Sequence, residues 1–328
     1  MKFRTEVFPE ATEKKISYQT PVLLTGSCFT QNIGNKLADL KFPVMMNPFG
    51  VLYNPFSVSK SFEIIANQQF FHHEDLGYFN NQYFSFYHHT VFSSPNSDEC
   101  LKNINTNIHE SHAFLNNAQF VFISLGTAKV YEYKQTGRIV SNCHKIPARE
   151  FNHRFLELEE CLLSLQDLVH SLHDFNNSLQ VIFTVSPVRH WKDGAVENQL
   201  SKSILFYAVH ETIKSNKHCT YFPSYEIMMD DLRDYRFYDS DLLHPNEMGI
   251  QYIWEKFSET FIDNQSKELM NDIEEIIKAY NHRPFNKESP AYLNFVKKYA
   301  DKVERIIKQY PGINLSEEAK YFNSFQQG

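Results

Sequence analysis

The feature that most constrains this chain is the alternation of short, almost uninterrupted apolar runs with amphipathic segments of helical spacing. Uninterrupted apolar runs are typical of parallel strands that are buried on both faces. We predict strands at residues 21–24, 42–46, 120–125, 181–185 and 220–222. We predict helices at residues 29–41, 56–68, 98–115, 155–174, 197–216 and 246–262. This order predicts an α/β fold in which a mainly parallel sheet is sandwiched between helices.

The predicted strands stop well before the end of the chain. Residues 267–280 and 290–309 instead have the pattern of charged amphipathic helices. We therefore predict an α/β domain over residues 1–263, with an aromatic-rich insertion near 69–95 that is irregular or a β-hairpin. A C-terminal helical extension is predicted over residues 264–328, where it would serve as a lid, a packing arm or a homodimer contact.

The charge balance limits the partners that this chain would bind. The formal net charge is -7 at pH 7 and no block of basic residues is present, which argues against nucleic acid or an anionic membrane as the main partner. A small molecule or a neutral polymer fits better. The N-terminus lacks the long apolar core of a secretory signal, and no stretch approaches the ~20 apolar residues that cross a bilayer. We therefore expect a soluble, cytoplasmic protein.

The cysteines and histidines signal neither a disulfide framework nor a metal site. The five cysteines are odd in number, scattered and free of CxxC pairs, which favours reduced thiols. His72, His73, His88 and His89 form two adjacent pairs, but adjacent residues of a strand point to opposite faces. Without carboxylates or cysteines at ligand spacing, we expect no metal and no other cofactor, and we place His88 or His89 near the mouth of the site, with His89 as the candidate substrate-binding residue.

The turn Thr25-Gly26-Ser27 is the first candidate for chemistry. Ser27 follows the first predicted strand and precedes a helix, where open α/β sheets hold their ligands and backbone N–H groups face negative charge. Ser27 is therefore a candidate nucleophile, although a Gly-Ser pair before a helix is also a common N-cap. Cys28 is a rival nucleophile, because a thiol at a helix N-terminus can have a lowered pKa. The alternative for Cys28 is simple packing in the core.

Asp241 and His244 are the candidates for a general base and the group that orients it. They lie three residues apart, just before Pro245 and the predicted helix at 246–262. This spacing lets the carboxylate hold one imidazole nitrogen while the other nitrogen faces a nucleophile. The alternative is that these residues only begin the helix, with an aspartate as its cap.

Further polar residues follow the third and fourth predicted strands at the same edge of the sheet. Asn142, His144 and Lys145 come after the third strand, and Arg189 and His190 come after the fourth. They are candidates for a substrate pocket, in which Arg189 offers a planar fork to a carboxylate or a hydroxyl-rich ligand. A network that only anchors the loops explains the same residues equally well.

The motif Gly26-Ser27-Cys28-Phe29-Thr30 resembles the signature of the GSCFA family, a bacterial group among the SGNH-type (GDSL-like) hydrolases. Further motifs extend the resemblance, in order, over roughly residues 20–260. These motifs are Asn47-Pro48-Phe49-Gly50, Tyr53-Asn54-Pro55, Leu125-Gly126-Thr127-Ala128, Asn142-Cys143-His144-Lys145, Thr184-Val185-Ser186-Pro187-Val188-Arg189-His190, Pro223-Ser224-Tyr225-Glu226 and Asp241-Leu242-Leu243-His244-Pro245.

The resemblance implies a three-layer α/β/α sandwich with a five-stranded parallel sheet, and a Ser-Asp-His catalytic set. The SGNH nucleophile lies in a Gly-Asp-Ser turn, whereas this chain has Gly26-Ser27-Cys28, so Ser27 matches the nucleophile by its position after the first strand. The last SGNH motif, Asp-x-x-His, matches Asp241 and His244 directly.

The resemblance also implies an oxyanion hole built from three groups. In the superfamily these are the N–H of the serine, a glycine N–H after the second strand and an asparagine after the third. Ser27 and Gly50 match the first two, whereas Thr127 stands in the Gly126-Thr127-Ala128 segment where Gly-x-Asn is expected. The loss of one donor costs on the order of 10² to 10³ in rate if nothing replaces it.

Together these features predict a serine esterase, a carboxylic ester hydrolase that removes an O-acyl group such as acetyl from a carbohydrate or another small alcohol ester. Ser27 would attack, His244 would transfer the proton and Asp241 would orient His244. The carbohydrate part rests only on what related families do. The alternatives are an O-acyltransferase acting on a glycan, and a binding protein that keeps the scaffold with weak catalysis.

Overall fold

The computed structural model describes residues 4–325, which form two compact units. The first unit holds the chain up to Glu10, Pro21–Gly34 and Val44–Phe257. The second unit holds Ala11–Thr20, Asn35–Pro43 and the chain from Ser258 onward. The C-terminal boundary thus lies near the predicted one, but the second unit also includes two N-terminal segments. The outermost residues of the predicted domains, 1–3 and 326–328, lie outside the described residues.

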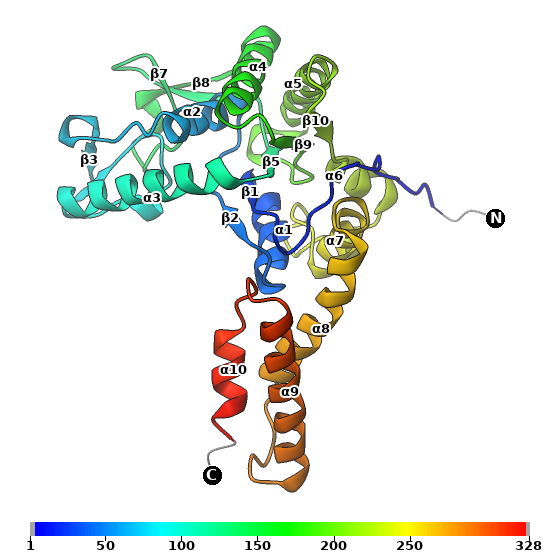
Figure 1. Cartoon of the computed structure of the whole chain (residues 1–328). Coiled ribbons are helices and arrows are strands. Elements are labelled where there is room, and N and C mark those ends of the chain that lie inside the picture. Colours follow the sequence, from blue (N-terminus) through cyan, green and yellow to red (C-terminus); the bar gives the residue numbers. More distant parts are fainter. Residues whose placement is uncertain (1–3, 326–328) are drawn as a thin grey trace. The chain divides into compact units, whose positions relative to one another are not determined.

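A five-stranded parallel sheet forms the centre of the first unit (Figure 1), and its strand order is β10-β9-β5-β1-β2. All five predicted strands are present in it. The strands are β1 (Val22–Gly26), β2 (Val44–Met46), β5 (Phe120–Leu125), β9 (Gln180–Val185) and β10 (Cys219–Tyr221). The strand order reverses at β1, because β2 pairs with one edge of β1 and β5 pairs with the other. In open α/β sheets, ligands bind where the strand order reverses in this way.

Helices follow the strands much as the sequence predicts. The long helices that begin in the first unit are α1 (Cys28–Asp39), α2 (Pro55–Ala66), α3 (Ser97–Asn117), α4 (Leu158–Phe175), α5 (Ala195–Lys214) and α7 (Glu247–Phe261). Short helical turns are η1 (His73–Asp75), η2 (Thr90–Phe92), η3 (Ala148–Glu150), η4 (Trp191–Asp193), α6 (Ser224–Glu226), η5 (Ile227–Asp231) and η6 (Tyr235–Phe237).

Alternate side chains of the central strand β5 face two different helical layers. Val121, Ile123 and Leu125 belong to the core shared with α2, α4 and α5. Phe122 points the other way, and its ring lies 5.0 Å from the ring of Phe257 on α7. Side chains alternate along a strand, so both faces of the sheet are covered. The predicted three-layer α/β/α sandwich is confirmed.

Two smaller sheets are added to this sandwich. The predicted insertion contains the antiparallel hairpin of β3 (Gly77–Phe79) and β4 (Gln82–Phe84). The second sheet was not predicted; it is three-stranded and antiparallel, and it consists of β6 (Lys129–Tyr133), β7 (Arg138–Val140) and β8 (Phe151–Phe155). Because β8 occupies residue 155, helix α4 begins at Leu158 and the predicted start of that helix was wrong by three residues.

The second unit is helical, and its described helices are α8 (Asn264–Tyr280), α9 (Pro290–Gln309) and α10 (Ser316–Asn323). Lys302 of α9 reaches two carboxylates of α8, Asp272 at 2.8 Å and Glu275 at 2.6 Å. The hydroxyls of Tyr292 and Tyr321 lie 2.9 Å apart and join α9 to α10. In the described part of the chain, no helix is both long and apolar enough to span a bilayer.

One close approach fixes the turn after β1, and it yields a stability prediction. Gly26 has φ +128°, and a Cβ there would lie 2.1 Å from the carbonyl oxygen of Ser124. Gly137 also has a positive φ, +68°, but a Cβ there meets nothing within 4 Å. We expect Gly26→Ala to destabilise the protein by at least ~2 kcal/mol more than Gly137→Ala in urea unfolding, since it adds a backbone clash to the conformational strain. Equal losses would contradict this packing.

Candidate active site

The candidate site begins with the turn that follows β1, where Ser27 is held in the interior. Its Oγ lies 2.8 Å from the Oγ of Ser124 and accepts a hydrogen bond from the N–H of Phe29 at 3.3 Å. The Ser27 N–H donates to the carbonyl of Ser124 at 3.0 Å. Only 2% of the residue is exposed. In this conformation the hydroxyl caps α1 and ties β1 to β5, so Ser27 as nucleophile stays a prediction that requires the side chain to rotate.

Cys28 is the accessible nucleophilic side chain of the same turn. It is the first residue of α1 and is partly exposed. Its Sγ lies 3.8 Å from the hydroxyl of Tyr53. The backbone N–H of Cys28 has no hydrogen-bond partner within residues 4–325. A free N–H at a helix N-terminus is suited to a developing negative charge.

Tyr53 connects this turn to the end of β5. Its carbonyl accepts hydrogen bonds from the N–H groups of Gly126 at 2.7 Å and Thr127 at 3.0 Å. Burial raises the pKa of Tyr53 above its usual value, and the neighbouring Cys28 raises it further. The phenol is therefore neutral at pH 7 and can both donate and accept a hydrogen bond.

His190 lies across Gly126 from this arrangement, after the end of β9. A Cβ on Gly126 would come within 2.9 Å of Nε2 of His190 and 3.0 Å of Cδ1 of Tyr53. The rings of Tyr53 and His190 meet edge to face, with centroids 5.1 Å apart. Burial, with a smaller contribution from Lys202, lowers the pKa of His190 to about 4, so the imidazole is neutral at pH 7. The absence of a side chain at Gly126 thus leaves space for an aromatic and an imidazole ring.

Asp241 and His244 form the dyad that the sequence predicts. Nδ1 of His244 lies 2.6 Å from Oδ2 of Asp241. The N–H groups of Leu243 and His244 donate to Oδ1 at 2.8 and 2.9 Å. The bond from the His244 N–H is the main cause that lowers the pKa of Asp241 to about 2, so the carboxylate is ionised at neutral pH. Nε2 of His244 has no partner in the described part of the chain.

The dyad and the turn lie at the same edge of the sheet, but they are not hydrogen-bonded to each other. Within residues 4–325, no hydrogen bond joins His244 to Ser27 or to Cys28. His190 connects the two groups, because it contacts Tyr53 and interacts electrostatically with His244. Sequence reasoning missed Tyr53 as a member of this site, although its Tyr-Asn-Pro motif was visible.

The three predicted oxyanion donors are already engaged within the protein. The Ser27 N–H bonds to Ser124, the Gly50 N–H donates to the carbonyl of Asn47 at 2.7 Å, and the Thr127 N–H donates to Tyr53. The Thr127 hydroxyl lies 2.9 Å from Oγ of Ser201. These donors therefore stay a prediction, and each of them would have to exchange a hydrogen bond to serve an oxyanion.

Three of the predicted substrate-binding residues lie in a separate network. The carbonyl of Ser85 lies 2.8 Å from Nε2 of His144, whose ring stacks on Phe84. Asn142 accepts a hydrogen bond from the N–H of His144 at 2.8 Å. Exposed His89 uses Nδ1 to accept from the N–H of Val91. These contacts fit a loop-anchoring role, the alternative that the sequence left open.

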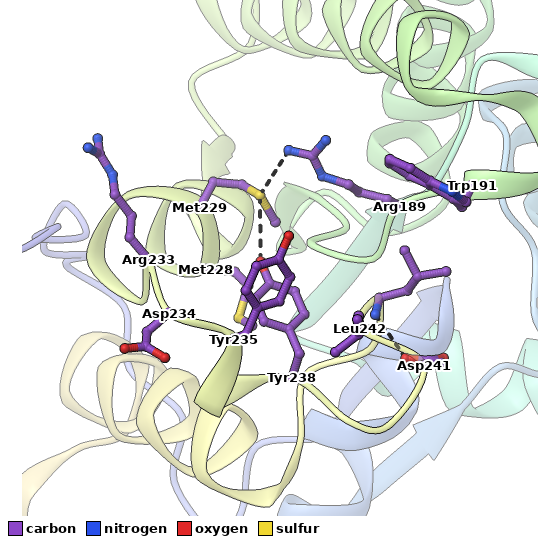
Figure 2. Close-up of a pocket in the computed structure, with 11 residues that line it drawn as sticks. Arg189, Trp191, Met228, Met229, Arg233, Asp234, Tyr235, Tyr238, Asp241 and Leu242 are labelled. Atoms are coloured by element: carbon purple, nitrogen blue, oxygen red, sulfur yellow. Dashed lines mark hydrogen bonds between the residues drawn. The ribbon is translucent and has the colours of Figure 1, made fainter.

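Arg189 instead lines a cavity of about 510 Å³ that also borders Asp241. Figure 2 shows its guanidinium directed at the sulfur of Met229, which it reaches at 3.5 Å. Tyr235 and Tyr238 form the neighbouring part of the lining, and Trp191 lies beside Arg189. Within residues 4–325, no group of three or more His, Cys, Asp or Glu side chains is arranged to hold a metal ion.

These features define an α/β protein with polar side chains gathered at the carboxyl edge of a parallel sheet. The sequence pattern of the GSCFA family matches residues 21–257, and that of the GSCFA domain protein, C-terminal domain, matches residues 273–326. The chain belongs to the GSCFA family.

Two solved structures show a distant likeness. One, provisionally described as a platelet activating factor from Streptococcus pneumonia, is 10% identical, with a TM-score of 0.39 over 73% of this chain and 82% of that one. The other, a carbohydrate esterase family 3 protein from Talaromyces cellulolyticus, is 9% identical, with a TM-score of 0.35 over 77% of this chain and 99% of that one. Likeness at this level says nothing about chemistry. None of the curated proteins matches the chain.

The buried, neutral histidines predict a loss of stability in acid. Burial lowers the pKa of His144 to about 4 from 6.5, so the unfolded chain binds more protons between these values and stability falls as pH falls through that window. We expect His144→Gln to reduce the loss of unfolding free energy between pH 7 and pH 4.5 by about 2–3 kcal/mol. The control is His109→Gln, which changes an exposed residue of α3 and should leave the pH slope unchanged. Equal slopes for both variants would refute the prediction.

Proposed function

We propose that this protein is an SGNH-type ester hydrolase that forms an acyl-enzyme on the turn after β1. The observation that carries the proposal is the Asp241–His244 dyad, with its 2.6 Å hydrogen bond and its free Nε2. An ionised carboxylate on Nδ1 fixes the tautomer in which Nε2 can accept a proton. His190 stays neutral, so no second imidazolium would oppose the charge that His244 gains when it takes a proton.

The geometry supports Cys28 better than Ser27 as the group that is acylated. Ser27 is buried and doubly hydrogen-bonded, whereas Cys28 is partly exposed and lies beside the Tyr53 hydroxyl. His244 would take the thiol proton as the sulfur attacks the ester carbonyl, and would return it to the alcohol oxygen as the C–O bond breaks. Water would then attack the thioester, give its proton to His244 and release the acid, while the thiolate regains the proton.

The oxyanion needs donors that are not already in use. The backbone N–H of Cys28 is free within residues 4–325, and the neutral Tyr53 hydroxyl lies next to the sulfur. These two groups are the donors that we propose. The backbone N–H groups of Ser27, Gly50 and Thr127 already donate hydrogen bonds within the protein. This observation favours the second candidate function, a binding protein with the same scaffold and weak turnover.

The substrate that we propose is an O-acyl ester of a carbohydrate or another small alcohol. Support comes from the cavity of about 510 Å³ beside Asp241, a volume suited to a small ligand. Its aromatic lining, which includes Trp191 and Tyr238, can stack on a sugar ring. Hydrolysis of p-nitrophenyl acetate tests the function itself, and an intact fold without hydrolysis or acylation would favour the binding protein.

The nucleophile is tested by a pair of substitutions on one turn. We expect Cys28→Ala to lower kcat/KM by at least about 10³-fold, because the attacking group is lost. We expect Ser27→Ala to keep activity within about tenfold, with a stability cost of about 1 kcal/mol for the lost hydrogen bond to Ser124. Thermal unfolding of both variants controls for folding. The opposite pattern, an inactive Ser27→Ala and an active Cys28→Ala, would restore the serine mechanism.

The role of the dyad is tested on the same loop. We expect Asp241→Asn to lower kcat by on the order of 10³ to 10⁴, because the amide no longer fixes the His244 tautomer. Asp239→Asn is the matched control, since within residues 4–325 this carboxylate accepts only a local bond from the N–H of Ser240. It should retain activity. Similar losses in both variants would show that the loop as a whole, rather than the dyad, is needed.

A further inference from the structure

The cavity beside Asp241 contains a cation without an anionic partner. The guanidinium of Arg189 is half-buried and its hydrogen bond to the sulfur of Met229 is 3.5 Å long. Within residues 4–325 no carboxylate forms an ion pair with it. An arginine removed from water normally finds a carboxylate or another acceptor, because its five N–H donors are costly to leave unsatisfied.

The other charged residues that line the cavity are already paired. Arg233 bonds Asp230 at 2.8 Å, and Asp234 bonds Arg236 at 2.7 Å. Asp241 is held by His244 and two backbone N–H groups. The negative charge of Asp241 is stabilised by these three hydrogen bonds. Arg189 is therefore the charged side chain of this lining that, within residues 4–325, has only the sulfur of Met229 as a hydrogen-bond partner, and its charge is positive.

Lys202 is a second basic side chain whose charge interacts with that of Arg189. Lys202 is completely buried, and its Nζ donates to the carbonyl of Ser186 at 2.7 Å. Burial, with a smaller contribution from the charge of Arg189, lowers the pKa of Lys202 to about 7. An anion bound to Arg189 would offset the repulsion between these two cations.

The uncharged part of the lining combines aromatic and thioether side chains with two leucines, Leu242 and Leu243. Trp191 and Tyr235 are exposed to solvent, and Tyr238 is half-buried. The sulfur of Met229 lies between Tyr238 and Arg189, 3.9 Å from the Tyr238 hydroxyl and 3.5 Å from the guanidinium (Figure 2). Such surfaces accept the face of a sugar ring. Flat aromatic faces combined with an unpaired guanidinium fork suit a polar ring that carries a carboxylate or a phosphate.

We propose that this cavity binds an anionic sugar, so that the ester substrate of the enzyme carries a carboxylate or phosphate anchored by Arg189. The place of this sugar in the reaction rests on the proposed function, whereas the binding itself does not. Because the cavity and the dyad share Asp241, a ligand anchored at Arg189 would lie next to the catalytic loop.

The test measures binding by the fluorescence of Trp191, with D-glucuronate, glucose 6-phosphate and D-glucose as probes for the full chain. The second tryptophan, Trp254, is 4% exposed, and Trp191→Phe identifies the source of the signal. We expect at least one of the two anions to bind at least about tenfold more tightly than glucose, and to bind less tightly as salt is added. Tighter binding of D-glucuronate would indicate a site for a carboxylate, and tighter binding of glucose 6-phosphate would indicate a site for a phosphate. Equal binding of all three sugars, or none, would overturn the proposal.

Matched arginine variants complete the test. We expect Arg189→Gln to weaken the binding of the anionic sugar by at least about tenfold, with glucose binding unchanged. Arg233→Gln is the control, because Arg233 lines the same cavity but is already paired with Asp230. It should change the affinity for the anionic sugar by less than about twofold. An unchanged affinity in Arg189→Gln would also overturn the proposal.

An activity measurement separates this inference from the proposed function. Anion binding that depends on Arg189, in a protein that hydrolyses no ester, would refute the hydrolase and leave the anion site intact. Ester hydrolysis without selective binding of either anion would refute the anion site and leave the hydrolase intact. In an active enzyme, Arg189→Gln should raise KM for an acetylated anionic sugar by at least about tenfold.

Discussion

The close approach of Gly26 to the carbonyl of Ser124 is the constraint on which the candidate site depends. No side chain fits between β1 and β5 at Gly26. The next residue, Ser27, contacts Ser124 twice, because its N–H donates to the Ser124 carbonyl and its hydroxyl lies within hydrogen-bond distance of the Ser124 hydroxyl. Helix α1 can then begin only at Cys28. The same contact thus buries one candidate nucleophile and presents the other, and the chemistry of the site follows from strand packing.

The larger part of the fold could be predicted from the sequence, because strands buried on both faces are nearly continuous apolar runs. The sheet of β6, β7 and β8 could not, since strands such as Lys129–Tyr133 mix charged and aromatic residues and do not stand out from a loop. The Asp241–His244 pair was predictable because both residues lie on one short loop. The direction of the Ser27 side chain was not, because it depends on Ser124, a residue 97 positions away.

Burial and charge divide the site into two parts with different tasks. Around Gly126, the neutral Tyr53 and His190 form a region without formal charge, in which a proton carried by His244 would be the main change in charge. Around Arg189, the positive charge has no partner among residues 4–325 and suits a ligand that supplies one. Asp241 holds His244 and also lines the cavity around Arg189, so the loop that carries the dyad forms a wall of the cavity.

We propose that the turn after β1 presents the thiol of Cys28 to the ester. The most direct test of this proposal is peptide mapping by mass spectrometry after a rapid acid quench of the protein with p-nitrophenyl acetate. We expect one acetyl group on Cys28, and neutral hydroxylamine should remove it, as it cleaves thioesters. An acetyl group on Ser27, with Cys28 unmodified and ester hydrolysis intact, would contradict the proposal.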